Sequence, residues 1–108
     1  SSVSNSNNGE PNCQVVAEIY LPVDIDTMKV RAIAIQAAQV SKQIYLNKPI
    51  TVLFFNEVKD RKSYLKMRLK AYVSDIRGEF GFKSEMTEIV IKKMIEEKMI
   101  KPDVYNID

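Results

Sequence analysis

Residues 64–73, YLKMRLKAYV, alternate between apolar and polar side chains almost without exception, and no other feature of the sequence constrains the fold as strongly. A period of two is typical of a β-strand that has one face in the core and the other in water. The side chains predicted to face the core are Leu65, Met67, Leu69, Ala71 and Val73. The side chains predicted to face water are Tyr64, Lys66, Arg68, Lys70 and Tyr72. The chain must therefore build a sheet with one covered face and one open face.

Two further strands are predicted before this segment. Residues 13–21, CQVVAEIYL, are rich in β-branched side chains and end at Pro22. Residues 50–58, ITVLFFNEV, form a nearly continuous apolar run, which is typical of a central strand that is covered for much of its length. The charged turn KDRKS is short enough to join this run to the alternating strand as an antiparallel hairpin.

Two helices are predicted from apolar residues that recur at spacings of three and four. The first runs from the DIDT segment to about residue 43, and its apolar stripe consists of Val30, Ile33, Ala34, Ala37, Val40 and Ile44. Gly78 and Gly81 mark a turn, and the second helix covers about residues 82–98. Its broad apolar surface consists of Met86, Val90, Ile91, Met94 and Ile95. Ile89 falls outside that surface.

The elements therefore follow the order strand, helix, strand, strand, helix, and residues 99–108 form either a short last strand or an exit segment. This order is typical of the α+β class, in particular of the ferredoxin-like split β-α-β two-layer sandwich, in which two helices cover one face of a sheet. A right-handed crossover through the first helix predicts that the first strand runs parallel to either the second or the third. Residues 1–12 are polar and aperiodic, so we expect a flexible linker there and a single domain over residues 13–108.

Asp24 and Asp26 stand ahead of the first helix, which raises the question of a catalytic or metal-binding pair. An Asp side chain in this place accepts hydrogen bonds from the free first-turn amides, and its charge suits the positive end of the helix dipole. A divalent metal would need further ligands, and the chain contains no histidine. We therefore interpret both residues as helix starters.

The sequence contains no other residue pattern that is typical of a catalytic site. Without histidine there is no Ser–His or Cys–His pair, and the single cysteine, Cys13, lies in an apolar strand where a thiolate is disfavoured. The glycines of RGEFGF lack the spacing of a phosphate-binding loop. We expect a protein that is not an enzyme, with no catalytic residue, no cofactor and no metal site.

The predicted open face interleaves aromatic and cationic side chains, as sheets that bind single-stranded RNA do. The strand lacks the glycine-containing signature of an RNA-recognition motif, and the formal net charge of the whole chain is only +2. The alternative is a solvated or subunit-facing surface, on which lysines also discourage unwanted strand pairing. We favour this alternative and expect no nucleic-acid partner.

Three segments carry a resemblance to a known family. The first segment, residues 18–30 (EIYLPVDIDTMKV), resembles that family's strand and acidic turn followed by a helix. The second, residues 54–73 (FFNEVKDRKSYLKMRLKAYV), resembles its next hairpin. The third, residues 82–103 (FKSEMTEIVIKKMIEEKMIKPD), resembles its last helix. In these segments the chain is similar to the carboxy-terminal cytoplasmic α/β domain of the small-conductance mechanosensitive (MscS-like) channel family. The resemblance covers about residues 13–104, and Asn56, Glu57 and the Asp24/Asp26 turn are its closest points of identity.

The resemblance implies a function without catalysis. In such channels several subunits, typically seven, enclose a cytoplasmic vestibule, and their α/β domains form its lower wall, with lateral portals for ions and small solutes. This domain would then be a soluble part of a homo-oligomer on the cytoplasmic side of the inner membrane, held to the membrane by helices that precede it.

The resemblance also suggests roles for single residues. Tyr64, Lys66, Arg68, Lys70 and Tyr72 would face a portal or a neighbouring subunit, where rings of like charge filter ions. Ile89 would pack on a neighbour, because exposed apolar residues often mark interfaces. Two other classes of protein stay open, namely a small ferredoxin-like regulatory module that binds a ligand, and an RNA-binding sheet.

Overall fold

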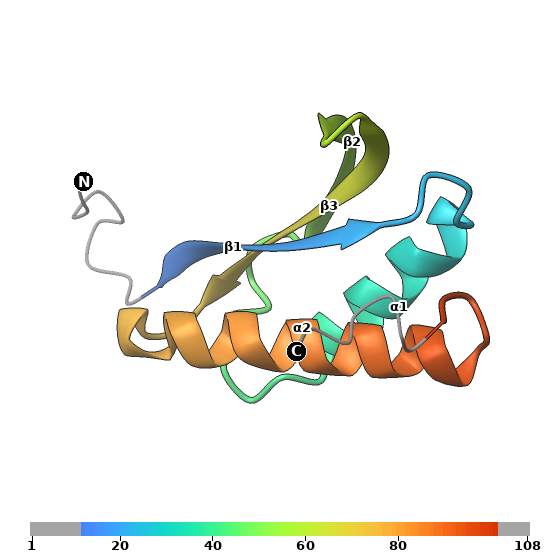
Figure 1. Cartoon of the computed structure of the whole chain (residues 1–108). Helices are drawn as coiled ribbons and strands as arrows, with labels where there is room; N and C mark the ends of the chain where they lie inside the picture. Colours follow the sequence, from blue (N-terminus) through green and yellow to red (C-terminus); the bar gives the residue numbers. More distant parts are fainter. Residues whose placement is uncertain (1–11, 102–108) are drawn as a thin grey trace.

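The computed structural model describes residues 12–101 and shows a mixed α+β fold, in which two helices pack on a three-stranded antiparallel sheet (Figure 1). The elements are β1 (Cys13–Leu21), α1 (Thr27–Gln39), β2 (Thr51–Lys59), β3 (Lys62–Val73), the 3-10 turn η2 (Ile76–Gly78) and α2 (Glu79–Glu96). The predicted order of strands and helices is confirmed. Asn12, the last residue of the predicted linker, is buried, whereas residues 1–11 and most of the possible last strand, 102–108, lie outside the described residues.

The central strand is β3, because it pairs antiparallel with both other strands and the sheet order is β1-β3-β2. The prediction that the apolar run at 50–58 is the central strand is therefore wrong. β2 lies at an edge, and Val52 is its only buried residue. Its apolar residues alternate between the two faces of the sheet. Val52 and Phe54 pack toward the core, while Leu53 and Phe55 lie on the open face and are 36% and 43% exposed.

The strand directions decide between the two predicted crossovers. β1 and β2 run parallel to each other with β3 between them, because each is antiparallel to β3. The alternative with the first and third strands parallel is wrong. The register sets Ala17 opposite Leu69 and Leu69 opposite Val52, so buried side chains of all three strands form one row.

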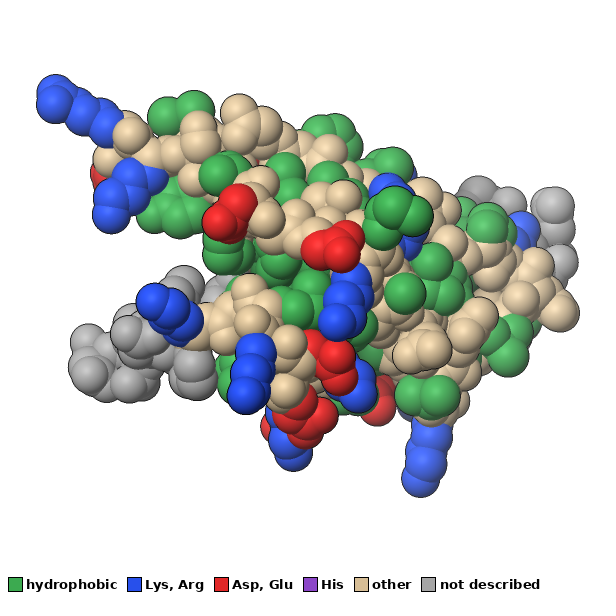
Figure 2. Space-filling model, turned by 90° about the vertical axis from the view of Figure 1, so that its right-hand side faces the viewer, with side chains coloured by type: hydrophobic (Ala, Val, Ile, Leu, Met, Phe, Trp, Pro, Cys, Tyr) green, Lys and Arg blue, Asp and Glu red, His purple; other side chains and the backbone are tan. Residues whose placement is uncertain are grey.

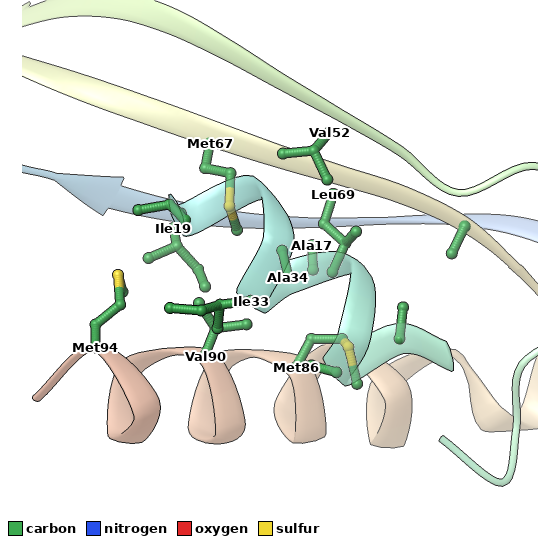
Figure 3. Packing of buried hydrophobic residues seen from close by; sticks show 14 of the residues in the cluster. Ala17, Ile19, Ile33, Ala34, Val52, Met67, Leu69, Met86, Val90 and Met94 are labelled. Carbon is green, nitrogen blue, oxygen red and sulfur yellow. The ribbon is translucent and has the colours of Figure 1, made fainter. Parts of the chain in front are cut away.

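The core lies between both helices and one face of the sheet (Figure 1). In β3 the alternation is confirmed, since Met67, Leu69, Ala71 and Val73 are fully buried, while Leu65 is partly buried at the margin. Burying a large apolar side chain contributes about 1.5–3 kcal/mol. Figure 3 shows the side chains of α2 directed at those of α1 and the sheet; the labelled ones on α2 are Met86, Val90 and Met94.

The start of α1 answers the question of the two aspartates. α1 begins at Thr27, and the Asp26 side chain caps it by accepting a hydrogen bond from the backbone N–H of Lys29 at 3.2 Å. The interpretation as a helix starter is confirmed for Asp26. It is wrong for Asp24, which lies two residues before the N-cap, in the turn after β1.

α1 ends earlier than predicted. Val40, which the sequence placed on the apolar stripe, is 75% exposed, and Ile44 forms an isolated bridge to the end of β3 instead of a further helical turn. The Ser41 hydroxyl stabilises the turn that follows α1. It donates a hydrogen bond to Glu85 Oε1 at 2.7 Å and accepts one from the Gln43 N–H at 3.2 Å. The loop after α1 is thereby tied to α2.

α2 begins at Glu79, so Gly81 lies in its first turn rather than in the turn before it. Gly78 and Gly81 leave room for the Gln43 side chain. A Cβ at residue 78 would overlap the Gln43 side-chain oxygen, and one at residue 81 would lie 3.2 Å from its side-chain nitrogen. At the other end the chain turns at Lys98, whose φ of 58° lies in the left-handed region.

Candidate interaction surface on the open sheet face

The structure brings together all the side chains that the sequence assigned to the open face. They project from β3 on the side opposite the core: Tyr64, Lys66, Arg68, Lys70 and Tyr72. All five are half-buried, because β3 is the central strand and side chains of both neighbouring strands flank it. The stripe is therefore the middle of a three-stranded surface and not an edge.

The strand register gives the neighbours of this stripe. Glu18 of β1 and Leu53 of β2 lie on either side of Arg68. In the next row, Tyr20 of β1 and Phe55 of β2 lie on either side of Lys66. Each cation is thus flanked by at least one apolar or aromatic side chain.

Carboxylates of the neighbouring strands pair with two of the three cations. Lys66 Nζ lies 2.6 Å from Glu57 Oε2 and 3.8 Å from Glu18 Oε2. Arg68 Nε lies 3.1 Å from Glu18 Oε2, although its N–H is not aligned for a hydrogen bond. The Tyr20 hydroxyl donates to Glu57 Oε1 at 3.2 Å. The hydrogen bond between Lys66 and Glu57 lowers the pKa of Glu57 and raises the pKa of Lys66.

Lys70 differs from these two cations, since no ion pair engages it among residues 12–101. Its neighbours across the strands are Val16 and Thr51, neither of which is charged. Lys48 Nζ lies over the ring of Tyr72, the last aromatic residue of the stripe, at 5.8 Å from the ring centre. The uncompensated positive charge of this face therefore lies toward the Lys70 end.

Aromatic and apolar side chains complete the surface. The rings of Tyr20 and Tyr64 form an edge-to-face pair with centroids 6.5 Å apart. Leu53 and Phe55 expose part of their surface on the β2 side. Aromatic side chains and arginine are enriched in surfaces that bind another protein, whereas lysine and glutamate are depleted there.

A groove of about 780 Å³ adjoins this face, between the end of β1, the start of β3 and α2. Its apolar lining includes Tyr20, Val23, Tyr64 and Ile91, and Asp24 lies at its margin. In Figure 2 hydrophobic side chains gather in a hollow below the lobe that projects at the upper left and ends in basic side chains. The groove has the size of a ligand site, and its lining also includes the charged side chains of Glu18, Asp24 and Lys62.

The described residues contain no group of three or more cysteine or acidic side chains that could hold a metal ion. Burial raises the pKa of the Cys13 thiol, and the charges of Glu79 and Asp75 raise it further. A thiol in such surroundings is a poor nucleophile at neutral pH.

Ile89 is not the free apolar residue that the sequence predicted. It is half-buried and packs against the core cluster, because the covered surface of α2 is wider than the predicted one. An exposed apolar residue of α2 is found instead at Phe80, which is 78% exposed. Sequence reasoning missed Phe80 because it placed the start of the helix at about residue 82.

Sequence reasoning also missed the partners of the cationic stripe. Glu18 comes from a strand whose neighbour it did not identify, and the predicted hairpin placed Glu57 beside the alternating strand without fixing the register, so the contacts with Lys66 and Arg68 were not predicted. The one available signal was the period of two in residues 13–21, which puts Glu18 and Tyr20 on the polar face of that strand.

No family model matches the sequence, and no curated protein matches it significantly. Among residues 12–101, no helix combines the length and the apolar character that crossing a membrane requires.

Proposed function

We propose that this domain is part of the cytoplasmic cage of a mechanosensitive channel subunit, where it contributes to assembly and to the filtering of solutes and has no catalytic role. The observation that carries the proposal is the open face of the sheet: the helices cover the other face alone, and the stripe from Tyr64 to Tyr72 stays accessible. The sequence resemblance at residues 18–30, 54–73 and 82–103 supports the same assignment.

The proposal includes the finer fold, the ferredoxin-like split β-α-β sandwich. An antiparallel sheet of order β1-β3-β2 with both helices on one face is compatible with that fold. In the cage, the domain would belong to a homo-oligomer, with seven subunits by resemblance, on the cytoplasmic side of the inner membrane. Helices that precede it in the longer protein would attach it to the membrane.

The ion pairs refine the proposed portal face. Lys66 and Arg68 are balanced by Glu57 and Glu18, so their main effect is to hold three strands together. Lys70 has no ion-pair partner among residues 12–101 and would bias a confined passage toward anions. We therefore assign the filtering role mainly to Lys70.

The test requires the full-length channel. Replacing Lys66, Arg68 and Lys70 together with glutamate should shift the reversal potential in a salt gradient toward cation preference, and Lys70→Glu alone should give most of that shift. Lys92→Glu, an exposed lysine on α2, is the charge-matched control. An unchanged reversal potential in the triple variant would rule out the portal role. A gene without apolar membrane spans ahead of residue 1 would contradict the channel assignment as a whole.

A second candidate, a regulatory module that binds a small ligand, is favoured by the groove of about 780 Å³, which lies in the size range of ligand sites. A ligand that binds the folded state alone raises the melting temperature with increasing concentration. Thermal melts of the chain against a library of apolar small molecules would therefore reveal it, and Ile91→Lys, which adds a charge to the groove, should abolish the shift.

The RNA-binding alternative has less support. Two of the three cations that would meet phosphates already pair with Glu18 and Glu57, and an RNA strand would have to displace those carboxylates. Titration with single-stranded RNA at low and moderate salt would test this alternative directly.

A further inference from the structure

One edge of the sheet is uncovered along the outer half of β2. β2 is the last strand in the order β1-β3-β2, and no other strand of residues 12–101 pairs with its outer side. Figure 1 shows the β2–β3 hairpin rising beyond both helices. Side chains on both faces of the hairpin are therefore open to solvent, and Phe55 is 43% and Val58 68% exposed. An exposed apolar edge of this kind is a template for pairing with another strand.

The hairpin turn determines which backbone groups of β2 point outward. Asp60 and Arg61 have φ values of 54° and 65°, as a two-residue turn of type I′ between Lys59 and Lys62 requires. The two residues that flank such a turn exchange both hydrogen bonds, and along an antiparallel pair such residues alternate with residues that exchange none. The odd-numbered residues of β2 therefore bond to β3. The N–H and C=O groups that point away from the sheet belong to the even-numbered residues Val52, Phe54, Asn56 and Val58.

A contact from α1 agrees with this assignment and closes one end of the edge. Arg31 donates from Nη2 to the Val52 carbonyl at 3.4 Å. No hydrogen bond within residues 12–101 engages the outward backbone groups of Phe54, Asn56 or Val58. Three successive outward residues are thus free to bind another strand.

The lysine of β2 does not protect this edge. Lysines on edge strands discourage pairing with another chain. Lys59, however, lies over the open face, with its Nζ 5.8 Å from the ring centre of Tyr20 on β1. The outer side of β2 is therefore left without the charge that commonly blocks strand addition.

A second copy of the same strand satisfies all three free residues. In an antiparallel pair about a two-fold axis at Asn56, this residue faces its own equivalent, and Phe54 of each copy faces Val58 of the other. Every free N–H and C=O of the edge then has a partner. The hydrogen bond from Arg31 to Val52 stays in place, because Val52 takes no part in the pairing.

Other registers are less favourable. An axis at Phe55 would draw in Val52, whose carbonyl is already engaged. An axis at Glu57 would leave Phe54 without a partner and would set the two Glu57 side chains directly opposite each other, which is destabilising. In the favoured register these glutamates are only diagonal neighbours, and each is already paired with Lys66 of its own chain.

Charge complementarity favours a second copy as the occupant. The same register sets Asp60 of one copy opposite Val52 of the other, and therefore beside the Arg31 guanidinium that binds the Val52 carbonyl. Neither Arg31 nor Asp60 belongs to an ion pair within the described residues. Arg61 follows in the half of the turn that returns to β3, on the side away from the contact. Opposite charges thus meet at both ends of the paired strands.

We propose that two copies of this chain join edge to edge through the outer half of β2, antiparallel about a two-fold axis at Asn56, so that their sheets become one continuous sheet. Main-chain hydrogen bonds supply the recognition, as in other cases of strand addition. The contact is isologous and closes with two copies. The inference goes beyond the proposed function and does not rest on it; in a cage, the contact would join two assemblies rather than neighbours within a ring.

Proline at residue 56 separates pairing from folding. The Asn56 N–H points outward and is not part of the β2–β3 ladder, and an edge strand tolerates proline at such a position. Asn56→Pro removes two hydrogen bonds from the dimer, so it should raise the dissociation constant at least about tenfold in sedimentation equilibrium. Asn56→Ser keeps the N–H and should pair as the original chain does. Circular dichroism checks that both variants are folded.

A cross-link tests the register. Residues of a hydrogen-bonded antiparallel pair have Cα atoms about 5.5 Å apart, within the range of a disulfide. In a Cys13→Ser background, Asn56→Cys should therefore give a covalent dimer on mild oxidation. Val58→Cys lies on the same edge, but the two copies of residue 58 would be about 13 Å apart along the strands, so almost no covalent dimer should form.

Charge exchange tests the choice of occupant. Asp60→Lys and Arg31→Glu each set like charges together at both ends, and each alone should weaken pairing about tenfold. An equimolar mixture of the two variants restores both opposite-charge contacts and should pair more tightly than either variant alone.

Several results would overturn the proposal. They are a chain that stays monomeric at millimolar concentration, an Asn56→Pro variant that pairs normally, cross-linking at residue 58 in place of residue 56, and charge variants that show no recovery on mixing. If the chain pairs only when it ends at Lys101, its own residues 102–108 are the occupant of the edge and the proposal fails.

Discussion

Glu57 on the edge strand and Lys66 on the central strand meet across the β2–β3 hairpin, with Glu57 Oε2 2.6 Å from Lys66 Nζ. The pair lies on the face of the sheet that the helices leave open. Both side chains remain in contact with solvent, so screening keeps the strength of the pair modest. Its geometry nevertheless ties β2, which within residues 12–101 has a partner strand on one side only, to the central strand β3.

We expect Glu57→Gln to lower the free energy of unfolding slightly at pH 7 and not at all at low pH. The pKa of Glu57 is lowered from its ordinary value of 4.5, chiefly by the hydrogen bond from Lys66. The folded state therefore favours the carboxylate, and this contribution is present above pH 4.5 and disappears as the pH falls through the lowered pKa. Urea denaturation at pH 7 and pH 3 measures the difference. Glu96→Gln, at an exposed residue of α2, is the control; a pH-independent gap for Glu57→Gln would contradict the account.

The alternation in β3 predicts very different costs for the same substitution on the two sides of the sheet. Leu69 is fully buried, so Leu69→Ala should lower the free energy of unfolding by about 2–5 kcal/mol through lost burial and a cavity. Leu53 is partly exposed on the open face, and Leu53→Ala should cost about 1 kcal/mol or less. Denaturant titrations of both variants provide the comparison. Equal costs would mean that the open face is covered in solution, for instance by a second chain.

Local pattern was sufficient to predict which elements form and which side of β3 and of α2 is buried. The period of two in β3 and the spacing of four from Phe82 to Met94 each fix a face, because a side chain's direction follows from its position along the element. The N-cap at Asp26 is equally local. These features depend on residues close together in the sequence, and they appear in the structure.

The relationships between elements could not be predicted in the same way. An apolar run such as that of β2 fits a central strand or an edge strand with two partly apolar faces, and only the pairing of β3 with both neighbours decides. The candidate site depends on that pairing, because Glu18 and Glu57 reach Lys66 from different strands. Gln43 likewise packs against Gly78 at the start of α2, and this contact between residues distant in sequence could not be predicted from local pattern.

Gly78→Ala should destabilise the fold through Gln43. A Cβ at residue 78 would overlap the Gln43 side-chain oxygen, and alanine is also a weaker N-cap residue than glycine, so we expect a cost of about 1 kcal/mol. Gln43→Ala removes the overlap, and the cost of Gly78→Ala should fall when both substitutions are combined. A double-mutant cycle by urea denaturation measures this coupling. Additive costs would show that the side chain of Gln43 moves aside freely.

Asp26 and Asp24 provide the last prediction, because the structure assigns them different roles although they stand two residues apart. The Asp26 side chain satisfies a free amide of α1, so Asp26→Ala should lower the free energy of unfolding by about 1 kcal/mol, within a range of about 0.5–2 kcal/mol. Asp24 precedes the cap and lies at the margin of the groove, so Asp24→Ala should change stability by less than about 0.5 kcal/mol. Asp26→Asn retains an acceptor for the Lys29 N–H and should recover most of the loss. If Asp24→Ala proved the costlier substitution, the cap would begin earlier than Thr27, and the acidic turn would have a role that the position of α1 does not explain.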